Sequence, residues 1–217
     1  MKHFIKEWGP LILFFLILIL SRAFIWQPVK VDGHSMDPTL ADGERLIVLS
    51  TTSIDRFDIV VAKETENGKT KEIVKRVIGM PGDTITYKND VLYVNGKKVD
   101  EDYLDEYKKA FEDDQLQDTY SYNTLFQELA EDSDAFTTDR DGNTEFTVKV
   151  PKGQYYLLGD DRIVSKDSRE VGTSLNQISS VKSNSAYGHS QKSALLINKI
   201  SLDSLVQTFL NSHYLTD

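Results

Sequence analysis

The 217-residue chain contains no cysteine, which excludes disulfide bonds, thiolate metal sites and cysteine nucleophiles and leaves the redox compartment open. Histidine is also scarce: the chain has four, and no two of them have the His-x-x-x-His spacing of a zinc site. The sequence therefore gives no sign of a metal or of a cofactor, and we expect neither.

A basic, aromatic-rich stretch of the kind that binds nucleic acid is missing as well. The net charge of −9 arises in one segment, residues 100–134, which holds thirteen carboxylates and two lysines. The remainder of the chain is close to neutral. Its overall composition, with 40% apolar and 27% charged residues, is that of an ordinary folded protein. We therefore expect no nucleic-acid partner.

One long uncharged apolar run lies near the N-terminus, at residues 8–21, and follows Lys2 and Lys6. Continued to Trp26, the run has nineteen residues, or about 28 Å of helix, which is close to the hydrocarbon thickness of a bilayer. The two lysines favour a cytoplasmic N-terminus, which places the rest of the chain outside. We predict that residues 1–26 form a single-pass anchor in the plasma membrane, with the lipid bilayer as a partner and an extracytoplasmic body.

Two other interpretations of this segment stay open. Ser21 and Ala23 have the −3/−1 spacing of a signal-peptide cleavage site, which would make the segment a cleaved leader. A buried core helix would be apolar too. The apolar residues 24–26, which follow the possible cleavage site, favour the anchor.

From Pro28 onward, short apolar runs alternate with turn residues, a pattern typical of strands. A Lys-Asn-Asp turn between two of the runs predicts a hairpin. The expected strands are residues 45–49, 58–62, 72–78, 83–87, 91–94, 146–150 and 155–158. Short strands with frequent turns favour a mainly β fold, with a sandwich or barrel-like all-β body over residues 27–172 after the N-terminal transmembrane helix.

Residues 100–134 interrupt this pattern with a small acidic insert. Apolar residues at helical spacing predict two short amphipathic helices within it. These residues are Leu104, Tyr107 and Phe111 in the first helix and Leu125, Phe126 and Leu129 in the second. A partner-binding or substrate-guiding lobe is one interpretation. A solvated surface excursion is the simpler one, and it is what we expect.

The C-terminal segment, residues 173–217, has a different character. Its first twenty or so residues are rich in Ser, Asn, Gln and Lys, which indicates a loop or a poorly ordered stretch. An apolar run follows at residues 194–200, and after it apolar residues recur at helical spacing.

Three segments hold residues that can do chemistry: GHSMDPTL at 33–40, KRVIGMPGD at 75–83 and GDDRIVSKDSR at 159–169. Each has a plain structural explanation on its own, as a turn serine, a solvated strand lysine and a salt-bridge network. Together and in this order, they resemble the type I signal peptidases, particularly the short Gram-positive forms, over roughly residues 10–172. The chain departs from that pattern after residue 174, as a divergent tail or a frameshifted C-terminus would.

The resemblance implies a membrane-bound serine endopeptidase with a Ser-Lys dyad. It assigns Ser35 as the nucleophile, Lys75 as the general base and Ser165 as the hydroxyl that orients the lysine amine. Met36 corresponds to a residue near the substrate groove. Gly33 stands where some relatives have a serine that donates to the oxyanion, so its backbone or another group must substitute. The charged scaffold behind the dyad corresponds to Asp160, Arg162, Asp167 and Arg169.

Such a lysine serves as a base only when it is neutral, and with a pKa near 10.4 only about 1 in 2,500 is neutral at pH 7. Burial lowers a lysine pKa. An alternating strand would bury Lys75 and leave Arg76, on the opposite face, free to pair with an acid. His34 is the alternative base, although adjacent residues on an extended backbone point to opposite faces, which turns it away from Ser35.

The resemblance also implies the substrate: exported preproteins, cleaved after small residues in an Ala-x-Ala pattern to remove the signal peptide. Two alternatives stay open. One is a regulatory Ser-Lys protease that cleaves itself, which the predicted anchor and the absence of a DNA-binding module disfavour. The other is an inactive membrane-anchored protein that grips preproteins or a partner through the acidic insert, its altered C-terminus having cost it activity.

Overall fold

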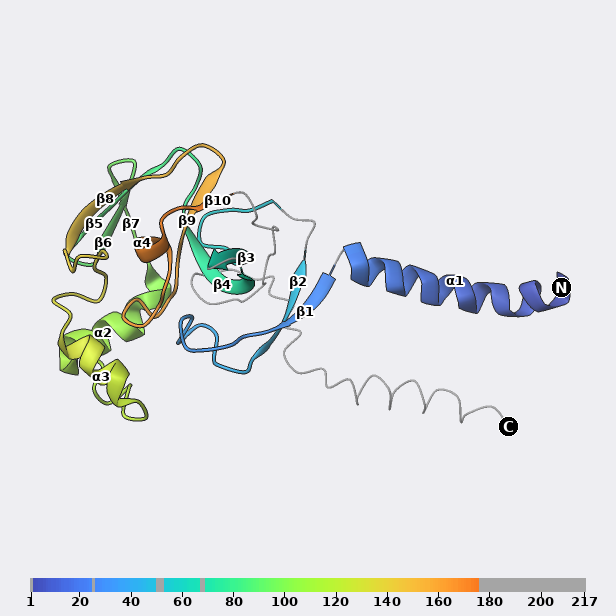
Figure 1. The fold of residues 1–217 in the computed structure, drawn as a ribbon, viewed down its shortest axis with the longest axis horizontal. Helices are drawn as coiled ribbons and strands as arrows, with labels where there is room; N and C mark the ends of the chain where they lie inside the picture. The colour runs from blue at the N-terminus through green and yellow to red at the C-terminus, as the bar shows by residue number, and fades with distance from the viewer. Residues whose placement is uncertain (1, 25, 50–52, 67–68, 176–217) are drawn as a thin grey trace. The chain divides into compact units, whose positions relative to one another are not determined.

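The computed structural model describes residues 2–24, 26–49, 53–66 and 69–175 (Figure 1). The expectations for the C-terminal segment beyond residue 175, including the apolar run at 194–200, lie outside the described residues.

Helix α1 (Lys2–Phe24) lies within the segment predicted as the anchor, residues 1–26, and its residues from 11 to 20 are all exposed. The interpretation as a buried core helix is therefore wrong. The helix ends at Phe24 and not at Trp26, because Trp26 opens a strand and Pro28 disfavours helix in the residue before it. Within the described residues, no helix is both long enough and apolar enough to cross a membrane.

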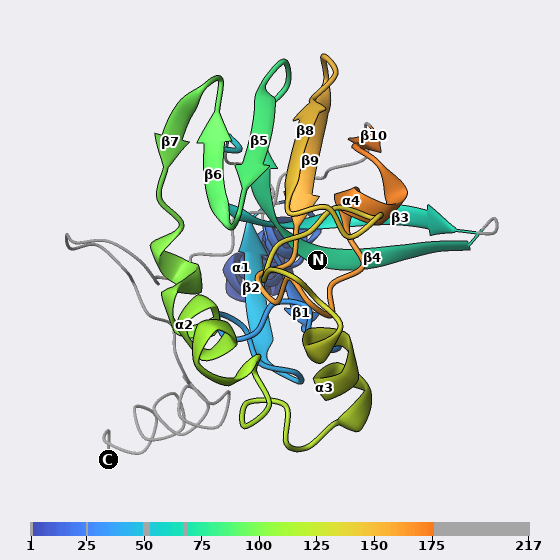
Figure 2. The ribbon, with the colours of Figure 1, turned by 90° about the vertical axis from the view of Figure 1, so that its left-hand side faces the viewer.

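The body is built from antiparallel strands that form three sheets in the described part of the chain. The first sheet pairs β1 (Trp26–Lys30) with β2 (Arg45–Leu49). The second has the order β10-β9-β4-β3, with β3 (Ile59–Glu66), β4 (Lys69–Gly79), β9 (Gln154–Leu158) and β10 (Ser174–Leu175). The third has the order β7-β6-β5-β8, seen side by side in Figure 2, with β5 (Thr84–Lys88), β6 (Val91–Val94), β7 (Lys97–Val99) and β8 (Glu145–Lys149). A short helix, α4 (Ser168–Val171), follows β9.

All seven predicted strands are present, as β2, β3, β4, β5, β6, β8 and β9. Strands β3 and β4 are longer than predicted because polar pairs such as Lys63 opposite Glu72 extend their ladder beyond the apolar residues. The predicted hairpin joins β5 and β6, where Asn89 and Asp90 both have positive φ, as a two-residue turn of this kind requires.

Three strands were not predicted, and each has a physical reason to be missed. Strand β1 contains Pro28, β7 has three residues of which two are lysines, and β10 has two residues. Strand β10 lies in the C-terminal segment that was expected to diverge from the body. Because it pairs with β9, the sheet extends at least to Leu175.

Two apolar clusters fix the position of β4. One joins the first sheet, the loop that follows β1, and β3; its buried members are Val31, Met36, Leu40, Leu46, Val48, Ile59 and Val61, with Val74 of β4 packed against them. The other joins the third sheet to β4 and β9; its buried members are Ile78, Ile85, Tyr87, Leu92, Val94, Val150, Tyr156 and Leu158. Residues 75 and 76 lie between these two anchoring points, so their side chains are held in place.

The acidic insert folds into the predicted helices, as α2 (Asp105–Asp114), preceded by the 3₁₀ turn η1 (Asp102–Leu104), and α3 (Thr124–Glu131). Its helices enclose a core of their own, formed by Leu104, Tyr107, Leu116, Tyr120, Ala130 and Phe136. Ile163 and Val164, from the third sequence motif, pack against that core. One side of the insert therefore packs against the motif segment, whereas Leu125 and Leu129 of α3 are 57% and 43% exposed. The expectation of a solvated surface excursion is wrong only for the residues in this core.

Candidate active site

Ser35 lies in the loop between β1 and β2, which is closed at its base by backbone hydrogen bonds. The Val31 N–H donates to the Glu44 carbonyl at 2.8 Å, and the Gly43 N–H donates to the Val31 carbonyl at 3.0 Å. Met36, directly after Ser35, is buried in the apolar cluster beneath the loop. The hydrogen bonds at the base of the loop and the burial of Met36 thus hold Ser35 in position.

Lys75 approaches Ser35 from β4. The side chain is turned inward by the alternation of the strand, and the residue is only 4% exposed. Its Nζ lies 2.6 Å from Ser35 Oγ, within hydrogen-bonding distance. The structure therefore brings together the two residues that the sequence motifs proposed as a pair.

Burial lowers the pKa of the Lys75 amine from its ordinary value. The negative charges of Asp167 and Glu64 act in the opposite direction, and the positive charge of Arg169 adds to the lowering. Desolvation prevails over the carboxylates. A larger fraction of the amine is neutral than in an exposed lysine, which is the condition for accepting a proton from a hydroxyl.

Arg76, the next residue on β4, points to the other face and pairs with Asp160. Its Nε donates to Asp160 Oδ1 at 2.7 Å and its Nη2 to Oδ2 at 2.5 Å, and both residues are buried. Burial by itself would lower the pKa of Arg76, but the hydrogen bonds and the charge of Asp160 outweigh it and raise the pKa. The prediction that Arg76 pairs with an acid is confirmed.

Arg162 forms a second buried pair, with Glu101. Arg162 Nη2 lies 2.6 Å from Glu101 Oε1, and both side chains are 0% exposed. The hydroxyls of Tyr87 and Tyr103 donate to the same carboxylate oxygen at 3.0 and 2.7 Å. Glu101 belongs to the acidic insert and was not predicted, because composition alone does not single out one of thirteen acids.

Asp167 and Arg169 form the third pair and hold the end of the motif. The carboxylate of Asp167 accepts hydrogen bonds from the N–H of Gly159 at 3.0 Å and from Arg169 Nε at 2.8 Å. Burial would raise the pKa of Asp167, yet Arg169 and these hydrogen bonds keep it below its ordinary value. Arg169 also donates to the carbonyl oxygens of Arg162 and Ser165, at 2.8 and 3.2 Å. The four predicted scaffold residues are thus all engaged.

Ser165 is buried beside the nucleophile loop. A Cβ placed on Gly159 would lie 2.2 Å from Ser165 Oγ and 2.3 Å from the carbonyl oxygen of Ser35, so only glycine permits this close approach. In the described part of the chain, Ser165 Oγ has no hydrogen-bond partner. Its predicted role in orienting the amine of Lys75 stays a prediction.

At Gly33, the backbone or another group was predicted to substitute for a missing oxyanion donor. Gly33 adopts a positive φ of 89°, which favours glycine, and its N–H donates to Asp42 Oδ1 at 2.8 Å. The N–H of Gly33 is therefore already used. The N–H of Ser35, by contrast, has no partner within the described residues.

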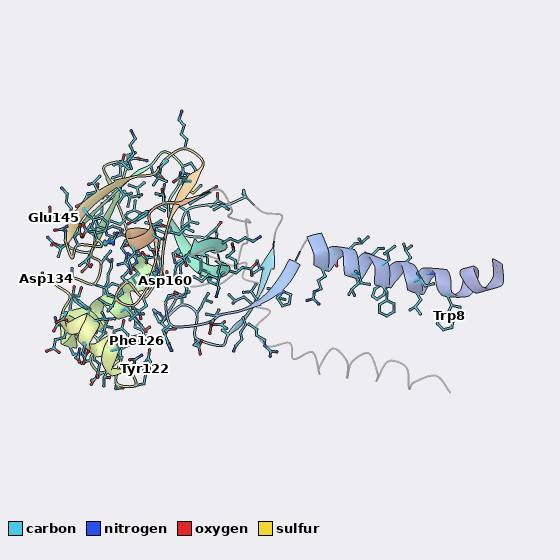
Figure 3. The ribbon with its side chains drawn as sticks, in the orientation of Figure 1. Trp8, Tyr122, Phe126, Asp134, Glu145 and Asp160 are labelled. Carbon is cyan, nitrogen blue, oxygen red and sulfur yellow. The ribbon has the colours of Figure 1, made fainter. Side chains whose placement is uncertain are left out.

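His34 is turned away from the nucleophile, as expected from its neighbouring position. Its Nδ1 lies 2.9 Å from Asp37 Oδ2, and its ring lies 5.2 Å from that of Tyr122 and 5.7 Å from that of Phe126, both labelled in Figure 3. Among the described groups, the side chain that contacts Ser35 Oγ is Lys75, not His34. This geometry disfavours a Ser-His arrangement.

An open cleft of about 610 Å³ runs past the Ser35–Lys75 pair. Met36 lines it, as predicted for a groove residue, although its side chain is almost completely buried. Phe126 of the insert and Val164 of the third motif also line it.

Two residues that the sequence analysis missed lie next to the backbone of Ser35. Asp161 is fully buried, and burial raises the pKa of its carboxyl to about 7. The hydroxyl of Tyr120 donates to Asp161 Oδ1 at 2.6 Å. The position of Asp161 next to Asp160, inside a motif, was the one available signal; nothing in the sequence distinguished Tyr120 from the other insert aromatics.

Known proteins with similar sequences point to one family. The family described as "Signal peptidase, peptidase S26" matches residues 5–187. The chain is 57% identical over 179 residues to signal peptidase I of Streptococcus pneumoniae serotype 4 (strain ATCC BAA-334 / TIGR4), covering 79% of this chain and 87% of that protein. It is 41% identical over 177 residues to signal peptidase IB of Staphylococcus aureus (strain COL), covering 79% and 83%.

A solved structure is also similar. The crystal structure of a signal peptidase I from Enterococcus faecalis V583 is 30% identical and covers 61% of this chain and 96% of that chain, with a TM-score of 0.42. The family match and the sequence relatives confirm the resemblance that the three motifs indicated. The chain belongs to the signal peptidase family, peptidase S26, and is a serine peptidase.

Proposed function

We propose that this protein removes signal peptides from exported preproteins by acyl-enzyme hydrolysis, with Ser35 as nucleophile and Lys75 as general base. The observation that carries the proposal is the 2.6 Å contact between Lys75 Nζ and Ser35 Oγ, made by a lysine that is almost fully buried. The family relatives, whose names are those of signal peptidases, supply the substrate class.

The reaction follows from this pair. Neutral Lys75 accepts the hydroxyl proton as Ser35 Oγ attacks the carbonyl carbon of the scissile peptide bond. The resulting ammonium then gives that proton to the leaving amine of the mature protein, and the signal peptide stays esterified to Ser35. Lys75 next accepts a proton from a water that attacks the ester and gives that proton to the departing Ser35 Oγ, which releases the signal peptide and restores the serine.

The tetrahedral intermediates need a hydrogen-bond donor for their oxyanion. The N–H of Ser35 is suited to this role because it has no partner among the described residues. The N–H of Gly33 is less suited, since Asp42 accepts from it. We therefore assign the oxyanion to the Ser35 N–H and not to Gly33.

The supporting residues have two tasks in this account. Asp160, Asp167 and Glu101 each neutralise a scaffold arginine, so that Lys75 is left without an ion-pair partner. Ser165 would orient the amine of Lys75, which its buried and unpartnered hydroxyl beside the Ser35 backbone supports. We expect the cleft beside Met36 to take the small side chains of an Ala-x-Ala site, as in the family resemblance.

Helix α1 is the proposed membrane anchor, within residues 1–26, with the N-terminus cytoplasmic and the body from residue 27 extracytoplasmic. The helix is 23 residues long, and ten consecutive residues from 11 to 20 are exposed on every side of it. A helix that is apolar all round needs an apolar environment, and a bilayer supplies one. Lys2 and Lys6 before the apolar run favour this orientation.

The test of the anchor compares the full chain with a chain that lacks residues 1–26. Both forms should cleave a short soluble peptide at similar rates. The full chain should process a bilayer-inserted preprotein faster, because tethering holds the nucleophile near its substrate. Equal rates on the inserted preprotein would remove the anchor from the account.

The test of the function itself is incubation of the detergent-solubilised full chain with a labelled preprotein. Wild type should release a fragment of signal-peptide size, and Ser35→Ala should release none. Ser53→Ala is the matched control, because Ser53 is exposed and does not line the cleft. Cleavage by Ser35→Ala would exclude Ser35 as the nucleophile, and no cleavage by wild type would favour an inactive binding protein.

A further inference from the structure

One buried residue, Asp161, is bonded to the nucleophile, to the base-orienting segment and to the acidic insert. Its N–H donates to the carbonyl of Ser35 at 3.3 Å, and its own carbonyl accepts from the N–H of Ser165 at 3.1 Å. Its Oδ1 accepts from the hydroxyl of Tyr120 at 2.6 Å. A displacement of Asp161 therefore displaces Ser35 and Ser165 together.

Within the insert, Tyr120 is held in place by packing and by backbone hydrogen bonds. Tyr120 is 0% exposed and sits in the insert core with Leu116 and Phe136. Its N–H donates to the Leu116 carbonyl at 2.8 Å, and its carbonyl accepts from the N–H of Asn123 at 2.8 Å. The backbone and ring of Tyr120 are thus both held, so its hydroxyl is a fixed point for the Asp161 carboxyl.

A second contact ties the insert to the same loop. The ring of His34, the residue before Ser35, packs against Tyr122 and Phe126 of the insert. The Phe126 ring in turn lies 5.6 Å from that of Tyr120. The insert is therefore connected to the loop of Ser35 at two successive residues. It contacts the ring of His34 directly, and it reaches the carbonyl of Ser35 through Asp161.

The carboxyl of Asp161 also differs from the other buried acids of the site. Glu101, Asp160 and Asp167 each form an ion pair with an arginine, whereas no ion pair of Asp161 is found in the described part of the chain. A carboxyl buried without a cation is costly to retain. Asp161 Oδ1 offsets that cost by accepting hydrogen bonds from the Tyr120 hydroxyl at 2.6 Å and from the Val164 N–H at the longer distance of 3.4 Å.

We propose that the acidic insert positions the nucleophile, with Tyr120 and Asp161 as positioning residues that act on Ser35 through its carbonyl. The proposal rests on the proposed role of Ser35. Neither residue needs to touch the substrate. Their effect is to hold Ser35 Oγ in line with the amine of Lys75, so loss of the connection lowers the rate of the chemical step and leaves substrate binding unchanged.

The test removes one hydroxyl from the full chain, by Tyr120→Phe. We expect kcat to fall by about tenfold, as for loss of one hydrogen bond of ordinary strength, with KM unchanged within about twofold. The matched control is Tyr107→Phe, in the same cluster with its ring 6.3 Å from that of Tyr120. The ring of Tyr107 packs against that of Phe136. Its hydroxyl makes no hydrogen bond among the described residues, so removal of that hydroxyl should leave kcat unchanged.

Two variants of Asp161 sharpen the test. Asp161→Asn keeps an oxygen that accepts from Tyr120 and should retain kcat within a few-fold. Asp161→Ala should lose at least as much as Tyr120→Phe, and adding Tyr120→Phe to it should cost nothing more. Equal kcat in Tyr120→Phe and Tyr107→Phe, or a change in KM alone, would overturn the proposal.

Amide hydrogen exchange over residues 33–40 gives a reading that does not depend on activity. Exchange in this loop should be faster in Tyr120→Phe than in wild type and unchanged in Tyr107→Phe. Unchanged exchange in Tyr120→Phe would overturn the positioning role even if Ser35 is the nucleophile. Faster exchange in a chain that fails to cleave preprotein would support the positioning role and count against the proposed function.

Discussion

Lys75 and Arg76 are adjacent cations on β4 and are buried to the same degree, at 4% and 5% exposure. Their environments shift their pKa values in opposite directions. Burial lowers the pKa of Lys75, whose close contact is the hydroxyl of Ser35. The carboxylate of Asp160 overcomes the same burial effect at Arg76 and raises its pKa. Burial alone therefore does not lower the pKa of a cation. The buried cation must also lack a contact with a carboxylate.

The other buried cations of the site are paired with carboxylates, as Arg76 is. Three acids are taken up by three arginines, and of the cationic residues that the structure describes as buried, Lys75 is the one without an ion pair. The protein thus keeps several buried charges close to the site and still leaves one amine able to lose its proton. Variants that change either the environment of Lys75 or that of Arg76 test this difference.

The largest effect is expected from Lys75→Arg, which makes the two neighbours chemically alike. Arginine cannot lose its proton at usable pH, so peptidase activity should fall by roughly 10⁴-fold or more. Ser35→Ala should fall as far, and the double variant should be no worse than either, because the two residues act as a unit. Lys69→Arg, an exposed lysine of the same strand, is the matched control. Activity of a few per cent in Lys75→Arg would exclude lysine as the base.

The next largest effect is expected on the free energy of unfolding, when Arg76 loses its carboxylate partner. Asp160→Ala leaves Arg76 buried without its carboxylate, which should cost about 3–5 kcal/mol of unfolding free energy. Adding Arg76→Met removes the orphaned charge and should restore part of the loss. Denaturant unfolding measures both. Lys98→Ala, in the exposed pair with Asp100, should cost less than about 1 kcal/mol. An equal, small loss in both cases would mean that the buried pair contributes no more than a surface pair.

A smaller effect of opposite sign is expected from Lys75→Met. Because the pKa of Lys75 is lowered in the folded state, the unfolded chain binds more protons below the ordinary lysine pKa, and the lysine destabilises the fold there. Lys75→Met should therefore unfold at higher denaturant concentration than wild type at pH 7. The difference should shrink as the pH rises towards the ordinary lysine pKa. A difference that does not depend on pH would point to packing as its cause.

The smallest effect is a shift of the pH profile in Glu64→Gln. The charge of Glu64 raises the pKa of Lys75, so its removal should move the rise of activity to lower pH. The carboxylate lines the cleft and lies 2.8 Å from Lys71 Nζ, so Lys71→Gln should be measured beside it. A shift to higher pH in Glu64→Gln would contradict the electrostatic account of Lys75.

Much of the proposed catalytic pair was predictable, because local patterns carry it. Alternation along residues 72–78 placed Lys75 and Arg76 on opposite faces of the strand, and the motifs supplied Ser35. The partner of Arg162 was not predictable, because Glu101 is one acid among many and only the fold brings it there.

The same limit applies to the insert. Its helices followed from apolar spacing, but spacing does not tell which apolar residues are covered, so the core of the insert was not expected. The connection from Tyr120 to Asp161 spans 41 positions in the sequence. Strands β7 and β10 were missed for a simpler reason, since two or three residues are too few to show a period of two.

The central claim is that Lys75 is the base, and the pH dependence of kcat/KM tests it most directly. This profile reports the pKa values of essential groups in the free enzyme. We predict that activity rises through a group whose pKa lies below that of an ordinary lysine and above that of an ordinary histidine. The same rise should persist in His34→Gln, which removes the imidazole beside Ser35, and in Asp161→Asn, which removes a carboxyl whose pKa burial raises to about 7. A rise centred near 6.5 that disappears in His34→Gln would contradict the account.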